Sequence, residues 1–192
     1  MVGWLRKLLG GANQDRSPKD VLMAVMADLA NPALAAKALR LYDNPQEFEA
    51  FLANLGQEAP WSEEGRIPTP PELAFEIYFA LLSENSLLGY IDWAAGREEI
   101  LAEFDRLFAS AGLIPFTEAE RDEATRICSM CEGRGDAFPA LIRHLEVAAQ
   151  TRGRTVVYFG MGQDANFPLL LTPECYKRWR FARFGTGFRV IP

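Results

Sequence analysis

The sequence predicts an α+β fold: a small, mostly antiparallel sheet of about four strands packed with helices, preceded by a three-helix N-terminal segment. Residues 155–172 contain two runs of β-branched, aromatic and leucine residues on either side of a Gly, Asp and Asn cluster, which is typical of two paired strands. Other segments repeat apolar residues at helical spacing. Strand and helix candidates do not alternate strictly, and this favours a mixed architecture over a parallel βαβ sheet.

Three short helices, separated by proline turns, are predicted in the first third of the chain. Ser17 followed by Pro18 indicates a helix start, because a hydroxyl can cap the first turn and proline suits the first helical position. Asn31 and Asn44, each followed by a proline, indicate two further starts. Apolar residues on one helical face follow each start, so each helix has a side to bury.

The predicted domain organisation has four parts. Residues 1–16 form a flexible or amphipathic N-terminus, and residues 17–56 form the helical segment. Residues 57–71, rich in Pro, Glu and Gly, form a loop or linker. Residues 72–192 form the α+β domain, which we expect to pack with the helical segment as one globular unit. At 192 residues the chain is long enough to bury a substantial core.

Capping boxes begin two of the remaining helices, because Thr69 pairs with Glu72 and Thr117 pairs with Glu120. The second of these helices is expected to run to about Cys131. Both strands of the predicted pair lack polar alternation, so we expect both of their faces to be covered. The other predicted elements are a short strand at 88–93, an amphipathic helix ending at Gly112, a helix from Asp136 to near Gly153, a helix after Thr172 and a last strand at 187–191.

Composition and charge narrow the classes of function. The chain is 49% hydrophobic and 24% charged, with a net charge of −6, as in an ordinary soluble globular protein. Residues 20–174 carry a net charge of −14, whereas residues 175–192 carry five cations and no acid. Most of the surface therefore repels a phosphate backbone, and we do not expect nucleic acid to be the partner.

The same sequence features predict a cytoplasmic protein. No apolar run approaches the roughly 18 to 20 residues that a membrane span requires. The short apolar stretch at the N-terminus lacks the cleavage site of a signal peptide, and three cysteines do not make a disulfide framework. Contact with a membrane is expected only as weak attachment by the N-terminus.

Cys128 and Cys131 have the spacing of a redox pair, but they lie at the C-terminal end of a predicted helix, where the helix dipole raises a thiol pKa. Buried structural cysteines are the favoured interpretation. The alternative is a zinc site made by Cys128, Cys131, His144 and Cys175. Twelve residues separate Cys131 from His144, as in a zinc finger, but His144 is the only histidine in the chain. We therefore expect neither a metal nor a cofactor.

Carboxylates are the remaining candidates for catalysis, because the chain lacks the common hydrolase and nucleotide-binding motifs. Asp92, at the end of a predicted strand, and Asp164, in the connection of the strand pair, would divide acid and base roles if they converge. The competing interpretation is that Asp164 and Asn166 brace the turn and that Asp92 caps the next helix. Gln163, Asp164 and Asn166 are also predicted to project beyond the sheet as a recognition loop. Pro168 is expected to place its part of the second strand at a sheet edge or a bulge.

The C-terminal segment, Y-K-R-W-R-F-A-R-F-G-T-G-F-R-V, interleaves cations with aromatic residues. Trp179, Arg180 and Arg183 are candidate contacts for an anionic ligand or for single-stranded nucleic acid. We favour an amphipathic helix in which Trp179 and Phe181 pack inward while the cations are solvated or meet the acidic body.

The small α+β domain, the acidic body, the missing catalytic set and the aromatic-rich end together favour an accessory or partner-binding protein of the cytoplasm, with another protein as its partner. Two alternatives remain open. One is a carboxylate-dependent hydrolase that uses Asp92 and Asp164, and the other is a weak binder of anionic ligands or single-stranded nucleic acid through the C-terminus.

Overall fold

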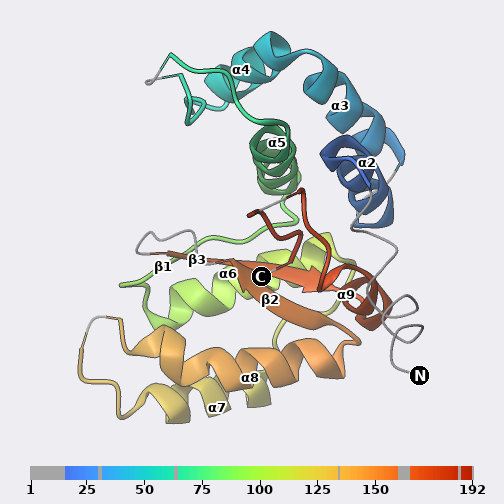
Figure 1. Cartoon of the computed structure of the whole chain (residues 1–192). Coiled ribbons are helices and arrows are strands. Elements are labelled where there is room, and N and C mark those ends of the chain that lie inside the picture. Colours follow the sequence, from blue (N-terminus) through green and yellow to red (C-terminus); the bar gives the residue numbers. More distant parts are fainter. Residues whose placement is uncertain are drawn as a thin grey trace, which may run out of the picture. The chain divides into compact units, whose positions relative to one another are not determined.

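In the computed structural model, the described residues (16–29, 32–62, 65–133, 135–159, 165–185 and 187–191) form eight helices and a three-stranded antiparallel sheet (Figure 1). This confirms the predicted α+β class and the three N-terminal helices. Among these helices, none has the length and apolar character that crossing a membrane requires. The elements are α2 (Pro18–Leu29), α3 (Pro32–Asp43), α4 (Pro45–Asn54), α5 (Pro70–Glu84), β1 (Ile91–Asp92), α6 (Arg97–Ser110), α7 (Glu118–Cys128), α8 (Ala137–Thr151), β2 (Thr155–Phe159), β3 (Ala165–Leu171) and α9 (Pro173–Trp179).

The chain separates into two compact units. The helical unit comprises Met1–Leu81 and Lys177–Ile191, and the sheet unit comprises Leu82–Tyr176. The boundaries fall inside α5 and α9, so each of these helices has residues in both units. The expectation that the helical segment and the α+β domain pack as one globular unit stays a prediction.

Proline marks the start of five of these eight helices, because its fixed φ suits the first helical position and its missing N–H is not needed there. At the first of them, Ser17 Oγ accepts a hydrogen bond from Asp20 N at 3.2 Å, as the sequence predicts. Asn44 acts differently: its side-chain amide donates to Arg40 O at 3.0 Å and so satisfies the end of α3. The five prolines are Pro18, Pro32, Pro45, Pro70 and Pro173.

The predicted capping box of α7 forms, and at α5 Thr69 N donates to Glu72 Oε2 at 3.2 Å. Thr117 Oγ1 accepts from Glu120 N, and Glu120 Oε2 accepts from Thr117 N at 2.8 Å. α7, however, ends at Cys128 and does not continue to Cys131. At this end Arg126 O accepts from the Ser129 hydroxyl at 2.7 Å and from Ser129 N at 3.3 Å, so the last turn is tightened.

The sheet has the order β1-β3-β2, and both pairings are antiparallel. The predicted strand pair is confirmed, with Thr155 opposite Leu171 and Phe159 opposite Phe167. The number of strands is three in the described residues, and not about four. The predicted strand at 187–191 is reduced to a single bridge between Arg183 and Arg189.

Pro168 lies in the central strand β3, so the prediction of a sheet edge at this proline is wrong. Pro168 O accepts a hydrogen bond from Gly89 N at 2.8 Å, which shows that the main-chain polar side of Pro168 faces the β1 segment. A residue in an antiparallel strand directs its N–H and C=O toward the same neighbouring strand. The missing N–H of Pro168 therefore removes a hydrogen bond to the β1 segment and none to β2. The predicted strand at 88–93 is accordingly broken into a bridge at Leu88 and the two residues of β1.

The core of the sheet unit joins α6, α7 and α8 to one face of the sheet (Figure 1). Ile91, Val156, Tyr158 and Leu170 contribute the sheet side of this cluster. Side chains of the opposite face are buried too, as the uninterrupted apolar runs predict. The buried residues of that face are Leu88, Val157, Phe159, Ala165, Leu169 and Leu171.

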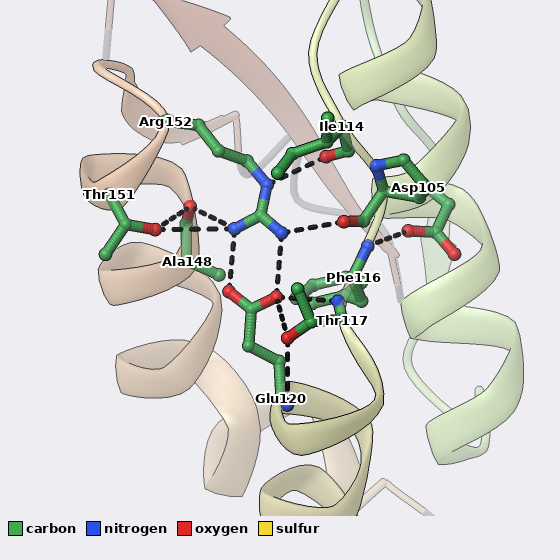
Figure 2. A network of polar contacts seen from close by, with 9 residues as sticks. Asp105, Ile114, Phe116, Thr117, Glu120, Ala148, Thr151 and Arg152 are labelled. Carbon is green, nitrogen blue, oxygen red and sulfur yellow. Dashed lines mark hydrogen bonds and ion pairs between the residues drawn. The ribbon is translucent and has the colours of Figure 1, made fainter.

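Arg152, the residue that follows α8, forms hydrogen bonds to α8, to the loop between α6 and α7 and to the first turn of α7 (Figure 2). Its guanidinium donates to both carboxylate oxygens of Glu120 at 2.7 Å, and also to the carbonyls of Ile114, Pro115 and Ala148, each at 2.8 Å. It also lies over the Phe108 ring, 4.6 Å from the centroid. The ion pair, with the hydrogen bonds from Thr117, lowers the pKa of Glu120 to about 2.

Candidate binding surface

Trp179, at the end of α9, anchors the C-terminal segment within the helical unit. Only 2% of this residue is exposed, and its indole N–H donates to Asp28 Oδ2 at 2.6 Å. The other oxygen of the same carboxylate accepts from Arg178 Nη1 at 2.5 Å. One aspartate of α2 therefore accepts hydrogen bonds from both an indole and a guanidinium. These bonds hold the end of α9, from which the C-terminal segment continues.

The chain after α9 folds back on itself. Val190 N donates to Ala182 O at 3.0 Å, and Phe184 N donates to Phe188 O at 2.9 Å. These two bonds flank a bridge in which Arg183 lies opposite Arg189. Such a pair has no hydrogen bond of its own, and in antiparallel pairs of this type the two side chains lie closest together.

Buried apolar side chains hold this turned segment in place. Ala182, Phe184, Val190 and Ile191 are 2% exposed or less. The Phe184 ring lies 5.4 Å from the Tyr78 ring, and Phe188 lies 5.2 Å from Phe75. Residues that alternate with the buried ones project to solvent, so Arg183 and Arg189 are presented on a packed support.

The exposed residues of this segment form what we call the C-terminal basic surface: Lys177, Arg180, Phe181, Arg183 and Arg189. The Arg180 guanidinium lies over the Phe181 ring at 4.7 Å. Within the described residues, none of these four cations forms an ion pair, whereas Arg178 beside them pairs with Asp28. The acidic body thus neutralises one arginine of this segment and leaves the others available.

Phe181 corrects the predicted amphipathic helix. The sequence predicts that Trp179 and Phe181 both pack inward, but Phe181 is 73% exposed. The helix ends at Trp179, so no helical face extends far enough to carry Phe181 toward the core. An aromatic ring that is both exposed and stacked by an arginine is a ready contact for a partner.

The structure places Asp92 beside the first residues of β3 but does not turn it toward Asn166. Asp92 lies opposite Ala165, and Asn166 lies opposite Ile91, which belongs to the core face. Neighbouring strand positions alternate in direction, so Asp92 and Asn166 belong to opposite faces. Asp92 Oδ1 accepts from Ala94 N at 2.8 Å, which braces the turn before α6.

Two further candidates of the hairpin connection, Gln163 and Asp164, lie outside the described residues. The shared acid and base roles of Asp92 and Asp164 therefore stay a prediction, and so does the recognition loop that includes Asn166. Arg180 and Arg183 belong to the C-terminal basic surface, and Trp179 supports that surface from within.

Cys128 and Cys131 lie together in one turn, with Cys131 N donating to Cys128 O at 3.0 Å. Both are half-buried, and burial, followed by the neighbouring Cys131, raises the pKa of the Cys128 thiol. In the part of the chain that the structure describes, no group of three or more His, Cys, Asp and Glu residues is arranged to hold a metal ion. The structure thus does not assemble the set of Cys128, Cys131, His144 and Cys175.

His144 stacks on the Phe116 ring, with 6.0 Å between the ring centroids and an angle of 13° between the planes. Its Nε2 atom is buried and has no hydrogen-bond partner in the described residues. The imidazole therefore contributes a flat apolar face between α7 and α8, and its contacts are those of a packing residue.

Glu76 is a residue that the sequence reasoning missed. It lies on α5, and burial, with a smaller contribution from the charge of Glu72, raises its pKa to about 7. The signal was present in the sequence, because Glu76 is the single charge in the apolar run 73–82. A lone acid in such a run predicts a desolvated carboxylate.

No protein-family model, curated protein or solved structure matches this chain.

Proposed function

We propose that this protein is a partner-binding protein and that its C-terminal basic surface receives an acidic segment of another protein. The observation that carries the proposal is the opposed pair Arg183 and Arg189, which is exposed and has no acid within ion-pair distance in the described residues. Like charges placed directly opposite each other destabilise a strand pair. An external anion would relieve this repulsion and would gain charge-assisted hydrogen bonds.

The chemistry of the surface favours a short acidic protein segment over a nucleic acid. Four cations would release few counterions, and for single strands they would give a slope of log K against log salt of only about −3. The net charge of −14 on residues 20–174 opposes any longer polyanion that extends past the cations. The exposed Phe181 adds an apolar contact that a protein side chain can fill.

A cytoplasmic location is part of the same proposal. Its support is that Cys128, Cys131 and Cys175 form no disulfide within the described residues, as expected in a reducing compartment.

Fluorescence polarisation with a labelled peptide rich in Glu and containing two aromatic residues tests the proposal. We expect saturable binding that weakens when salt is raised from about 50 to about 200 mM. Arg183→Glu combined with Arg189→Glu should lower the affinity by at least about tenfold, because two charge-assisted contacts of roughly 1 kcal/mol each are lost.

The matched control reverses two exposed arginines of the sheet unit, Arg126→Glu and Arg143→Glu, which changes the net charge by the same amount. The control should keep most of the affinity. Equal losses in both double variants would mean that only net charge matters, and the assignment of the surface would then be wrong. Tighter binding of a single-stranded oligonucleotide than of the acidic peptide would also contradict the proposal.

A further inference from the structure

β2 is a terminal strand of the sheet, because the order is β1-β3-β2. Its residues Thr155–Phe159 pair with β3 on one side, and the other side carries no strand in the described residues (Figure 1). Thr155, Val156, Val157, Tyr158 and Phe159 are β-branched or aromatic, and they include no charge and no proline. Natural proteins protect unpaired sheet edges with lysine, proline, a bulge or a covering helix or loop, and β2 contains no lysine, no proline and no bulge.

The position of Pro168 fixes which groups of β2 face outward. Pro168 O accepts from Gly89 N, so the main-chain groups of Pro168 face away from β2. Tyr158 lies opposite Pro168 and is therefore in a pair without mutual hydrogen bonds. The alternation of an antiparallel ladder then directs N–H and C=O of Val157 toward β3 and those of Val156 and Tyr158 toward the open edge.

These outward groups have no main-chain partner in the described residues, and the side chains beside them are held by the core. Neither Val156 nor Tyr158 takes part in any of the backbone hydrogen bonds found outside the regular helices and strands. Both side chains pack against the cluster of α6, α7 and α8, and the Tyr158 ring meets the Phe138 ring at 5.4 Å. The edge is thus a rigid row of donors and acceptors, which is the feature that strand addition uses.

We propose that β2 pairs with β2 of a second copy of this chain, in antiparallel orientation and centred on Val157. In this register Val156 lies opposite Tyr158 of the second copy, and each pair exchanges both of its N–H···O bonds. The same residues therefore satisfy each other on both sides of a two-fold axis, which is the requirement for an isologous dimer. Because β2 is uncharged, no like charges meet across this pairing.

A second copy suits this edge better than a chemically selected peptide does, because β2 has no charged side chain that would choose an acidic or basic partner strand. The other edge cannot serve equally well. β1 has only two residues, and the break opposite Pro168 prevents it from extending. Dimerisation through β2 would produce a six-stranded sheet with the order β1-β3-β2-β2-β3-β1.

Sedimentation equilibrium of the full chain, over a wide concentration range, tests the proposal. We expect the wild type to change from monomer to dimer as its concentration rises. Val156→Pro removes the outward N–H without removing a bond to β3, so it should weaken dimerisation by more than about tenfold while the circular dichroism spectrum stays unchanged. Val156→Ala keeps that N–H and is the matched control, which should still dimerise.

Residue-resolved hydrogen exchange of the wild type decides the location even if the proline variant fails to fold. The amides of Val156 and Tyr158 should exchange more slowly at high than at low protein concentration, whereas that of Val157, bonded to β3, should already be protected in the monomer. A wild type that stays monomeric at every concentration overturns the proposal. A dimer whose Val156 and Tyr158 amides show no concentration dependence overturns it as well, because the contact would then lie elsewhere.

Discussion

Arg152 and the opposed pair Arg183 and Arg189 show two opposite environments for the same side chain. The Arg152 side chain is 5% exposed, and its guanidinium donates to the Glu120 carboxylate and to main-chain carbonyls. Arg183 and Arg189 are exposed and form no ion pair in the described residues. A saturated guanidinium contributes to folding, whereas an unsaturated one on a packed support is available for binding. The number of acceptors around the guanidinium therefore separates a structural arginine from the two arginines to which we assign binding as a proposal.

The largest expected effect comes from removing the saturated arginine. Arg152→Met leaves the Glu120 carboxylate without its partner and leaves the Ile114 and Pro115 carbonyls without a donor, so we expect a loss of roughly 3 kcal/mol in the free energy of unfolding. Urea denaturation measures this loss. The double variant Arg152→Met with Glu120→Gln should be less destabilised than the sum of the two single variants, because no uncompensated charge remains.

If Arg152→Met lowers the free energy of unfolding by less than about 1 kcal/mol, the buried guanidinium contributes no more than an exposed one, and the contrast with Arg183 and Arg189 is wrong.

The second effect tests the broken strand beside Pro168. A Cβ atom on Gly89 would lie 2.7 Å from Pro168 Cγ and 3.0 Å from Leu107 Cδ1. Gly89→Ala should therefore cost about 1 to 3 kcal/mol through overpacking, as measured by thermal or urea unfolding. Gly96→Ala is the control, because its nearest neighbour would be 3.9 Å away, and it should lose less than about 1 kcal/mol. Equal losses would show that the close approach is not the cause.

The third effect concerns pH and Glu76. The pKa of Glu76 rises in the folded state to about 7 from an ordinary value of 4.5, so its contribution to stability is fully present below 4.5 and is lost as the pH rises through 7. This group alone should make the protein roughly 3 kcal/mol less stable at pH 8 than at pH 4.5. Glu76→Gln should remove that part of the pH dependence. Parallel stability curves for the two proteins between these pH values would contradict the raised pKa.

The smallest effect on stability is expected at the exposed arginines, Arg183 and Arg189. Arg189→Gln removes the charge repulsion between Arg189 and Arg183. The free energy of unfolding should therefore rise, by no more than about 0.5 kcal/mol. The same variant should weaken binding of the acidic peptide. A clear loss of stability in urea denaturation, with peptide binding unchanged, would reclassify Arg189 as structural and remove the distinction from Arg152.

Local signals in the sequence predicted most helix starts, because a capping residue and a proline act within one turn of the chain. Ser17 with Pro18 and Thr117 with Glu120 are examples. The strand pair at 155–172 was predictable for a similar reason, since its two runs adjoin a turn cluster. The predicted helix after Asp136 also forms, although Asp136 Oδ2 accepts from Gly133 N at 2.8 Å and does not cap the helix with its side chain.

Features that depend on distant neighbours were not predictable. The order of strands decides whether Pro168 lies at an edge or in the centre, and nothing near Pro168 in the sequence states that order. The loss of the strand at 187–191 arises because the chain turns back after Arg183 and pairs only once. The candidate surface was predicted in part: Arg180 and Arg183 were selected, Arg189 was not, and Phe181 was assigned to the wrong side.

The positions of the tryptophans determine which unit an optical experiment would observe. Trp61 and Trp179, both in the helical unit, are 1% and 2% exposed, whereas Trp93 in the sheet unit is 47% exposed. Emission from a buried indole shifts to longer wavelength on unfolding, and that of an exposed one changes little. With Trp4→Phe to remove the indole outside the described residues, fluorescence would follow mainly the helical unit. Far-ultraviolet circular dichroism follows both units, so transitions that coincide would mean that the two units unfold together.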